Sequence, residues 1–285
     1  MWLINVLLRS DTPRIRSHPA PSRPSQKRQS QVHSRERVTT MKCLLPIALF
    51  PALLAAMDHR RNSPSPSSQI RLRYPPVIQA DHSWVAPPYA WNFGHWYPTY
   101  TSFPAYLSLY NFQSDIYPQF PTTQAAADLR QNLDLASYNL PATGNSTADD
   151  YVYTAFGLDT PAPEIGSAVF NFTGQGYWHL TNYYMYIAWG YDTEGYGYYV
   201  QYETPVEAGG DGDIAIVSRK LGGPSPATTT AIFHALNTTF AGETRGNLAK
   251  YAGNLQKLKT DGRRDGQGIV PCDQACVLNA WMAGL

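Results

Sequence analysis

The feature that most constrains the fold is the segment 191–202, Y-D-T-E-G-Y-G-Y-Y-V-Q-Y. Its first part carries turn-forming residues, and the rest alternates in the two-residue period of a β-strand. One face would carry Tyr196, Tyr198, Val200 and Tyr202, and the other Tyr199, Gln201 and Glu203. We expect the first, apolar face to point inward. A strand of this kind is typical of a sandwich or a barrel, and a barrel can hold an apolar ligand against such a lining.

Short apolar segments broken by turn residues recur along most of the chain. They cover residues 94–103, 107–117, 132–138, 151–157, 167–173, 175–181, 183–191, 196–204 and 213–218. Eight or nine short strands at this spacing predict an all-β sandwich or barrel. After Arg219 the pattern changes to helical spacing, with Ser225 as N-cap and Pro226 at the first helical position. We therefore expect one α-helix after the last strand, and a weaker helical stretch over 245–259.

The first 57 residues do not resemble part of a folded domain. Residues 1–40 are rich in Arg, Ser and Pro and are expected to be a disordered basic leader. Residues 41–57 form a short apolar run that ends in small residues, as in a secretory signal peptide. This order favours Met41 as the true start. A transit peptide in 1–40 and a short membrane anchor at 43–57 remain alternatives.

The rest of the chain divides by composition. Residues 58–90 are rich in Pro, Ser and Arg and are expected to be a disordered linker, residues 91–260 the barrel with its C-terminal helix, and residues 261–285 a tail. The tail holds Cys272 and Cys276, which in an exported protein are expected to form a disulfide. A metal pair and two free thiols are the alternatives. The histidines show no ligand spacing, so we expect no metal site.

Export is also consistent with three N-glycosylation triplets, at Asn145, Asn171 and Asn237. The chain has 22 basic and 21 acidic residues, of which nine and two lie before residue 58, so a mature chain would be near −6. This charge argues against a nucleic-acid partner. We expect a secreted protein without a stable membrane span.

Three short motifs, in order, resemble those of the lipocalins, in particular a secreted fungal type related to the lipocalin domain of violaxanthin de-epoxidase. They are Gly94-His95-Trp96, the turn at 191–196 that contains Asp192, and the last strand 214–219, which ends in Arg219. The resemblance implies a lipocalin-like antiparallel β-barrel with the C-terminal helix packed outside. It also implies that Trp96 closes the barrel floor and that Arg219 stacks over it, so both are expected to be scaffold residues.

The resemblance and the aromatic lining together predict a protein that binds a small hydrophobic molecule, such as a lipid, sterol, pigment or aromatic metabolite. The expected lining is Tyr184, Tyr186, Tyr198, Val200 and Tyr202. These side chains could instead fill a small barrel. The acidic pairs Asp149-Asp150 and Asp211/Asp213 are read as solvated turns, and no catalytic motif or cofactor site is recognised. The alternatives are an isomerase or de-epoxidase-like enzyme on the same barrel and a non-binding interaction protein.

Overall fold

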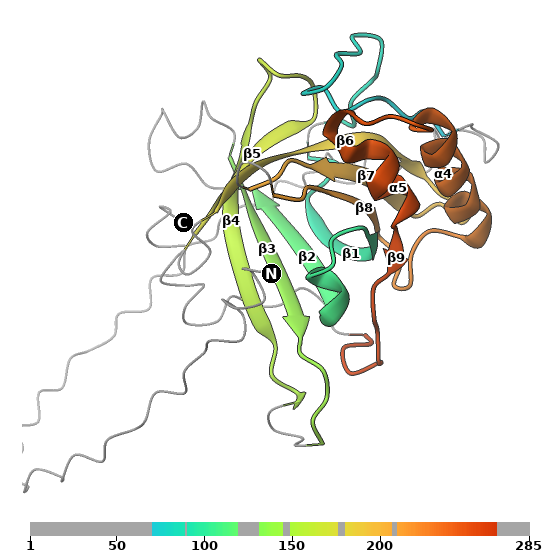
Figure 1. Ribbon diagram of the computed structural model, residues 1–285. Coiled ribbons are helices and arrows are strands. Elements are labelled where there is room, and N and C mark those ends of the chain that lie inside the picture. The colour runs from blue at the N-terminus through green and yellow to red at the C-terminus, as the bar shows by residue number, and fades with distance from the viewer. Residues whose placement is uncertain are drawn as a thin grey trace, which may run out of the picture. The chain divides into compact units, whose positions relative to one another are not determined.

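The computed structural model describes residues 70–88, 90–118, 131–144, 149–175, 180–206 and 210–266. These residues form a closed antiparallel barrel with helices outside it (Figure 1). The barrel strands are β1 (Gly94–Thr101), β2 (Tyr110–Pro118), β3 (Asn132–Asn139), β4 (Tyr153–Pro161), β5 (Val169–Gly174), β6 (Thr181–Tyr191), β7 (Gly197–Glu203) and β8 (Asp213–Ser218). The predicted fold class is confirmed. The segment expected as a separate strand at 175–181 lies mostly outside the described residues, and its last residue, Thr181, is the first residue of β6.

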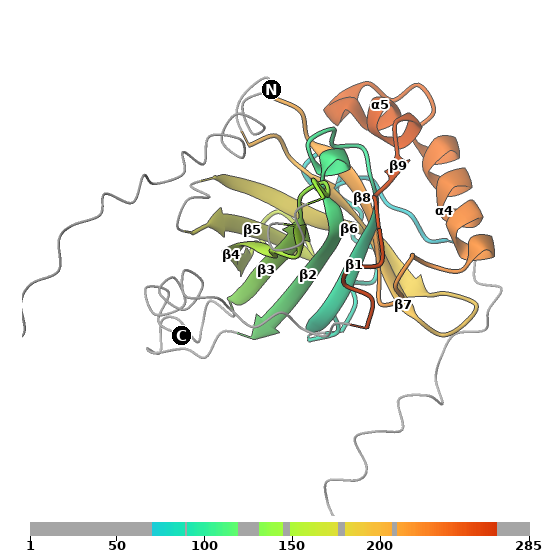
Figure 2. The same cartoon turned by 90° about the horizontal axis from the view of Figure 1, so that it is seen from below.

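Each strand pairs with its neighbour in the chain, and β1 closes the barrel by pairing with both β8 and β2. The contact of β1 with β2 is short and runs from Gly94 to Trp96. Beyond it the C-terminal strand β9 (Gln256–Lys257) pairs with β1 on the side away from β8 (Figure 2). Lys259 then accepts a hydrogen bond from the backbone of Asn111 in β2 (2.8 Å). The end of the chain therefore bridges the two strands where they diverge.

The outer face of β6, β7 and β8 is covered by the two α-helices (Figure 1). They are α4 (Pro226–Thr239) and α5 (Leu248–Gly253), with a 3₁₀ turn, η3 (Arg245–Asn247), between them. Ser225 caps α4 by accepting a hydrogen bond from the Thr228 backbone, and Pro226 occupies the first turn, as predicted. The apolar stripe of α4, which includes Ile232 and Leu236, is fully buried against the sheet.

Asp192 connects the β6–β7 turn to the start of α4. Its buried carboxylate accepts backbone hydrogen bonds from Glu194 and Tyr196 in the turn and from Ser225 at the helix cap (2.8–2.9 Å). Thr193 also donates to the Ser225 hydroxyl (2.7 Å). The turn residues expected from sequence alone therefore also orient the helix that covers the barrel.

The floor of the barrel is closed by Trp96 under Arg219. Trp96 is fully buried, and the Arg219 guanidinium lies 3.7 Å from the centre of its ring. Arg219 also donates to the backbone oxygens of Trp91, Phe93 and His95. Gly94 has a φ of +98°, and a Cβ there would lie 3.2 Å from the Arg219 guanidinium, which explains the glycine.

The expected linker over 58–90 is corrected for its last part, because residues 70–88 pack on the barrel. Arg73 donates from its backbone and side chain to the β6 carbonyls of Ile187 and Tyr186 (2.9 Å each), and it stacks on the Trp84 ring at 3.7 Å. Trp84 is buried in the same cluster as Trp96. Composition suggested a linker because these anchors are few and widely spaced. In the part of the chain that the structure describes, we find no helix with the length and apolarity needed to cross a bilayer.

A short 3₁₀ helix, η2 (Tyr106–Ser108), follows β1 at the barrel end opposite Trp96. It begins a row of ring contacts that passes from Phe103 and Tyr106 to Phe112 and then to Tyr138 and Tyr153, with centroid distances of 5.0–6.2 Å. Aromatic side chains therefore line this end of the barrel as well as the floor.

Candidate functional site

The barrel interior contains a continuous group of aromatic side chains. Tyr199 packs on Trp96 at the floor, with ring centroids 4.8 Å apart, and Tyr186 packs on Tyr199 at 4.4 Å. Phe170 of β5 stacks on Tyr184 at 5.1 Å and reaches Tyr186 at 5.7 Å. The structure therefore brings two of the expected lining residues, Tyr184 and Tyr186, together inside the barrel.

The other three expected lining residues point the opposite way. Tyr198, Val200 and Tyr202 lie on the outer face of β7 and are buried with Ile232 and Leu236 of the covering helix. Their assignment to the barrel lining is wrong. The alternation was read correctly, but helices cover this part of the sheet, so its most apolar face points outward to them. Tyr199, Gln201 and Glu203 face the interior instead.

Four acidic side chains share the interior with these rings. They are Asp134 of β3, Asp159 of β4, Glu203 of β7 and Asp213 of β8. Direct cross-strand pairing shows their common orientation, because Glu203 is opposite both the inward Tyr184 and Asp213, while Asp159 is opposite Asn132. Asp213 was expected in a solvated turn, but it is buried at the start of β8. These four acids are far apart in the sequence, and the register of the barrel strands brings them together.

Burial raises the pKa of all four carboxyl groups. The pKa of Asp134 is raised to about 6, and neighbouring Asp134 and Glu203 add to the effect of burial on the pKa of Asp159, which lies well above its usual range. Within the described residues, no Lys, Arg or His lies at ion-pair distance from any of them. As far as the structure describes the chain, the interior therefore holds acidic groups without a paired countercharge.

The four acids differ in how well the protein satisfies them. Asp213 accepts hydrogen bonds at both oxygens, from Thr101 and from the backbone and hydroxyl of Ser102 (2.6–2.8 Å), so it holds the loop after β1. Asp159 accepts the Tyr184 hydroxyl at Oδ2 (2.7 Å), while its buried Oδ1 has no partner among the described residues. Oδ1 of the paired Asn132 is likewise buried without one. Such orphaned oxygens are uncommon in folded proteins and indicate a ligand or water site.

Four inward side chains of the barrel are only half-buried. Asp134, Gln201, Glu203 and Phe170 all point inward, yet each keeps part of its surface accessible. An eight-stranded barrel is just wide enough to leave room for one small ligand. These half-buried inward side chains and the unpartnered oxygens of Asn132 and Asp159 together mark this part of the interior as the candidate ligand site.

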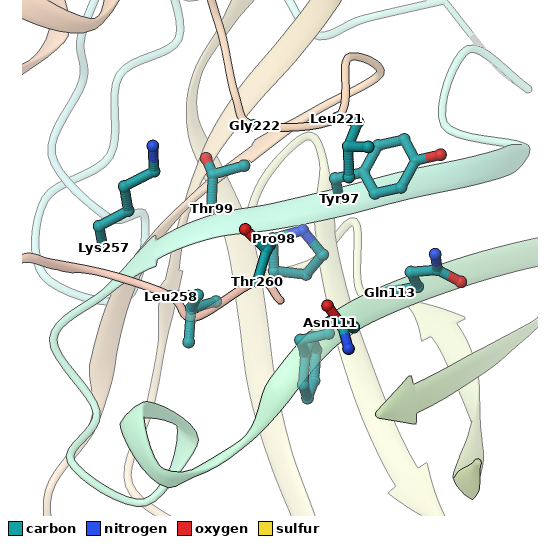
Figure 3. Close-up of a pocket in the computed structure, with 11 residues that line it drawn as sticks. Tyr97, Pro98, Thr99, Asn111, Gln113, Leu221, Gly222, Lys257, Leu258 and Thr260 are labelled. Carbon is teal, nitrogen blue, oxygen red and sulfur yellow. The ribbon is translucent and has the colours of Figure 1, made fainter. Parts of the chain in front are cut away.

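A small pocket lies where β1 and β2 diverge (Figure 3). Tyr97 and Thr99 of β1, Asn111 and Gln113 of β2, and Leu258 after β9 line it. Its enclosed space of about 20 Å³ suits about one water molecule, too little for an organic ligand. The described residues also contain no group of three or more His, Cys, Asp or Glu side chains arranged to hold a metal ion.

The remaining sequence predictions are only partly covered by the structure. Asn237 is exposed on α4, and Asn171 is half-buried on the outer face of β5. Asn145, the pair Cys272 and Cys276, the leader and the signal segment lie outside the described residues. Glycosylation, the disulfide and secretion therefore stay predictions.

Comparison with known proteins finds a related sequence and a structural neighbour. The chain is 29% identical over 230 residues to "Botcinic acid biosynthesis cluster B protein 12" of Botryotinia fuckeliana (strain B05.10), covering 78% of this chain and 96% of the relative. A solved structure of the siderocalin Ex-FABP, described as functioning through dual ligand specificities, aligns with a TM-score of 0.35 and 13% identity, over 63% of this chain and 94% of that one. No family model matches the chain.

Proposed function

We propose that this protein binds a small organic molecule inside its barrel, with an apolar or aromatic part against the tyrosine and phenylalanine rings. The observation that carries the proposal is the pair of buried, unpartnered oxygens on Asn132 and Asp159 beside half-buried inward side chains. A barrel filled only for stability would bury apolar groups there, since an unsatisfied polar group costs about 1–3 kcal/mol. The relative from a biosynthesis cluster is consistent with a ligand made by specialised metabolism.

Phe170→Ala tests the site, with the uncharged dye N-phenyl-1-naphthylamine as the probe. Phe170 is inward, half-buried and stacked on Tyr184, and its ring makes no hydrogen bond that the change would break. Losing about 40–60 Å² of apolar contact at about 25 cal/mol per Å² costs about 1–1.5 kcal/mol, so we expect about five- to twelvefold weaker binding in a fluorescence titration.

Tyr198→Ala is the matched control. It also truncates a ring on the barrel wall, but that ring lies on the outer face against the helices. We expect it to lower the melting temperature and to leave dye affinity within about twofold at a temperature where both variants are folded. Equal weakening by the two changes, or no saturable dye binding by the parent protein, would refute binding inside the barrel.

A second candidate is an enzyme on the same barrel, and one observation favours it. Tyr184 and Asp159 share a hydrogen bond of 2.7 Å inside the barrel, and the raised pKa of Asp159 would let it act as a general acid near neutral pH. Incubating the protein with small molecules extracted from the source organism separates the two functions. A molecule bound and released unchanged supports a carrier, and one converted in proportion to protein and time supports the enzyme.

A further inference from the structure

We infer that the ligand of the barrel carries a protonated amine, which binds at the Asn132–Asp159 pair while its apolar part lies against Tyr184, Tyr186 and Phe170. The inference rests on the proposed function and specifies the chemical class of the ligand. It follows from which hydrogen-bonding groups face the interior, which of them lack partners, and how charge is distributed around them.

Three buried polar atoms at this site lack a partner among the described residues: the Oδ1 atoms of Asn132 and Asp159, which are acceptors, and the Tyr186 hydroxyl, which can accept as well as donate. Asn132 and Asp159 face each other across β3 and β4, and each has a buried Oδ1 without a hydrogen bond. Both residues are almost fully buried, so bulk water does not satisfy these oxygens. A group that donates several hydrogen bonds from one atom suits acceptors on two neighbouring residues, and a primary ammonium donates three.

The charge around the pair favours a cation over a neutral donor. Asp134, Glu203 and Asp213 add three acidic groups to Asp159, and no basic side chain of the described residues is paired with any of them. A buried carboxylate is costly without a countercharge and stabilising with one. The ligand itself would supply the missing positive charge.

The rings beside the acids are also suitable neighbours for a cation. Tyr184 donates to Asp159 and lies 5.1 Å from Phe170 and 6.1 Å from Tyr186, measured between ring centroids. An ammonium within about 6 Å of an aromatic ring gains about 1–2 kcal/mol when desolvated. The same rings provide the apolar wall for the carbon skeleton, so one ligand can use both halves of the site.

An ammonium must displace protons from the acids to bind, so its affinity depends on pH. In the free protein burial raises the pKa of these carboxyl groups, and they repel one another. An amine resembling the Lys side chain stays protonated up to about pH 9–10. Affinity for the amine should therefore rise with pH across the neutral range, while affinity for an uncharged analogue should not. The groups that face Asp159 and Glu203 from the surrounding elements are Tyr106 of η2, Asp134 of β3, Asn182, Tyr184 and Tyr186 of β6, Tyr199 and Gln201 of β7, and Asp213 of β8.

The experiment compares 2-naphthylmethylamine with 2-naphthylmethanol, which share a ring system and differ in charge. We measure both by isothermal titration calorimetry on the full chain at about pH 5.5 and about pH 7.5. We expect the amine to bind at least about tenfold more tightly than the alcohol at the higher pH, and about tenfold more weakly at the lower pH than at the higher. The affinity for the alcohol should change by less than about twofold.

Asp159→Asn removes the charge but keeps an oxygen that can accept from Tyr184. We expect it to reduce amine affinity about tenfold and to leave alcohol affinity within about threefold. Asp211→Asn is the matched control, because it removes the same charge from an exposed residue that pairs with Lys250 (2.7 Å). This variant should bind the amine and the alcohol as tightly as the parent does. If Asp159→Asn does not fold, the pH comparison on the parent protein still decides the question.

The outcomes separate the inference from the proposed function. If the alcohol binds as tightly as the amine at both pH values, the amine inference is wrong and binding inside the barrel stands. If amine affinity is unchanged by Asp159→Asn, the cation does not bind at this pair and the inference is wrong. If neither compound binds and the dye does not bind either, both proposals fail.

Discussion

The free energy of unfolding of the ligand-free protein should fall as pH rises through the neutral range. The contribution of Asp134 to this fall can be calculated. This carboxyl group points into the barrel, accepts a hydrogen bond from Ser114 (2.9 Å), and has its pKa raised by burial from 3.8 to about 6. A group whose pKa is higher in the folded state stabilises the fold below its unfolded pKa and loses that contribution as pH rises through its folded pKa. For this shift, the change between about pH 5 and about pH 8 is about 1.4 kcal/mol.

Asp134→Asn isolates that contribution, because asparagine keeps an oxygen for Ser114 and stays neutral at every pH. We compare urea unfolding of the parent and the variant at about pH 5 and about pH 8. The free energy of unfolding should fall by about 1.4 kcal/mol more in the parent than in the variant over this interval. Asp211→Asn, on the surface, should behave like the parent. Parallel pH dependence in the parent and Asp134→Asn would show that Asp134 does not titrate as the structure implies.

Two further predictions concern the scaffold. Trp96→Ala should destabilise the protein by about 3–5 kcal/mol, because it empties a fully buried ring site and removes the surface on which Arg219 stacks. A melting curve equal to that of the parent would contradict the assignment of Trp96 to the barrel floor. Asp192→Ala should lower the free energy of unfolding in urea by about 3 kcal/mol, because three backbone donors of the turn and the α4 cap lose their acceptor. A decrease below about 0.5 kcal/mol would show that Asp192 does not stabilise the helix.

Sequence reasoning placed Tyr184 and Tyr186 in the barrel interior correctly, but it chose the wrong face of β7. This error has a physical cause. The sequence pattern separates an apolar face of β7 from a mixed one, and it does so correctly for Tyr198 and Tyr199. An apolar face marks contact with other apolar groups, whether these lie inside the barrel or on a covering helix. Because α4 and α5 pack outside β6–β8, the more apolar face is the outer one. The mixed face, with Gln201 and Glu203, is therefore the one that points into the barrel.

The sequence by itself determined most of the strands, the capped helix and the Asp192 turn, and its resemblance to the lipocalins implied the stacking of Arg219 on Trp96. These features depend on local periodicity and turn chemistry, or on motifs whose order along the chain is retained in the barrel. Only the tertiary structure decided that residues 70–88 join the barrel and that acids from β3, β4, β7 and β8 meet inside it. Such contacts depend on strand register and on which face a helix covers, because residues far apart in sequence become neighbours only when the barrel closes.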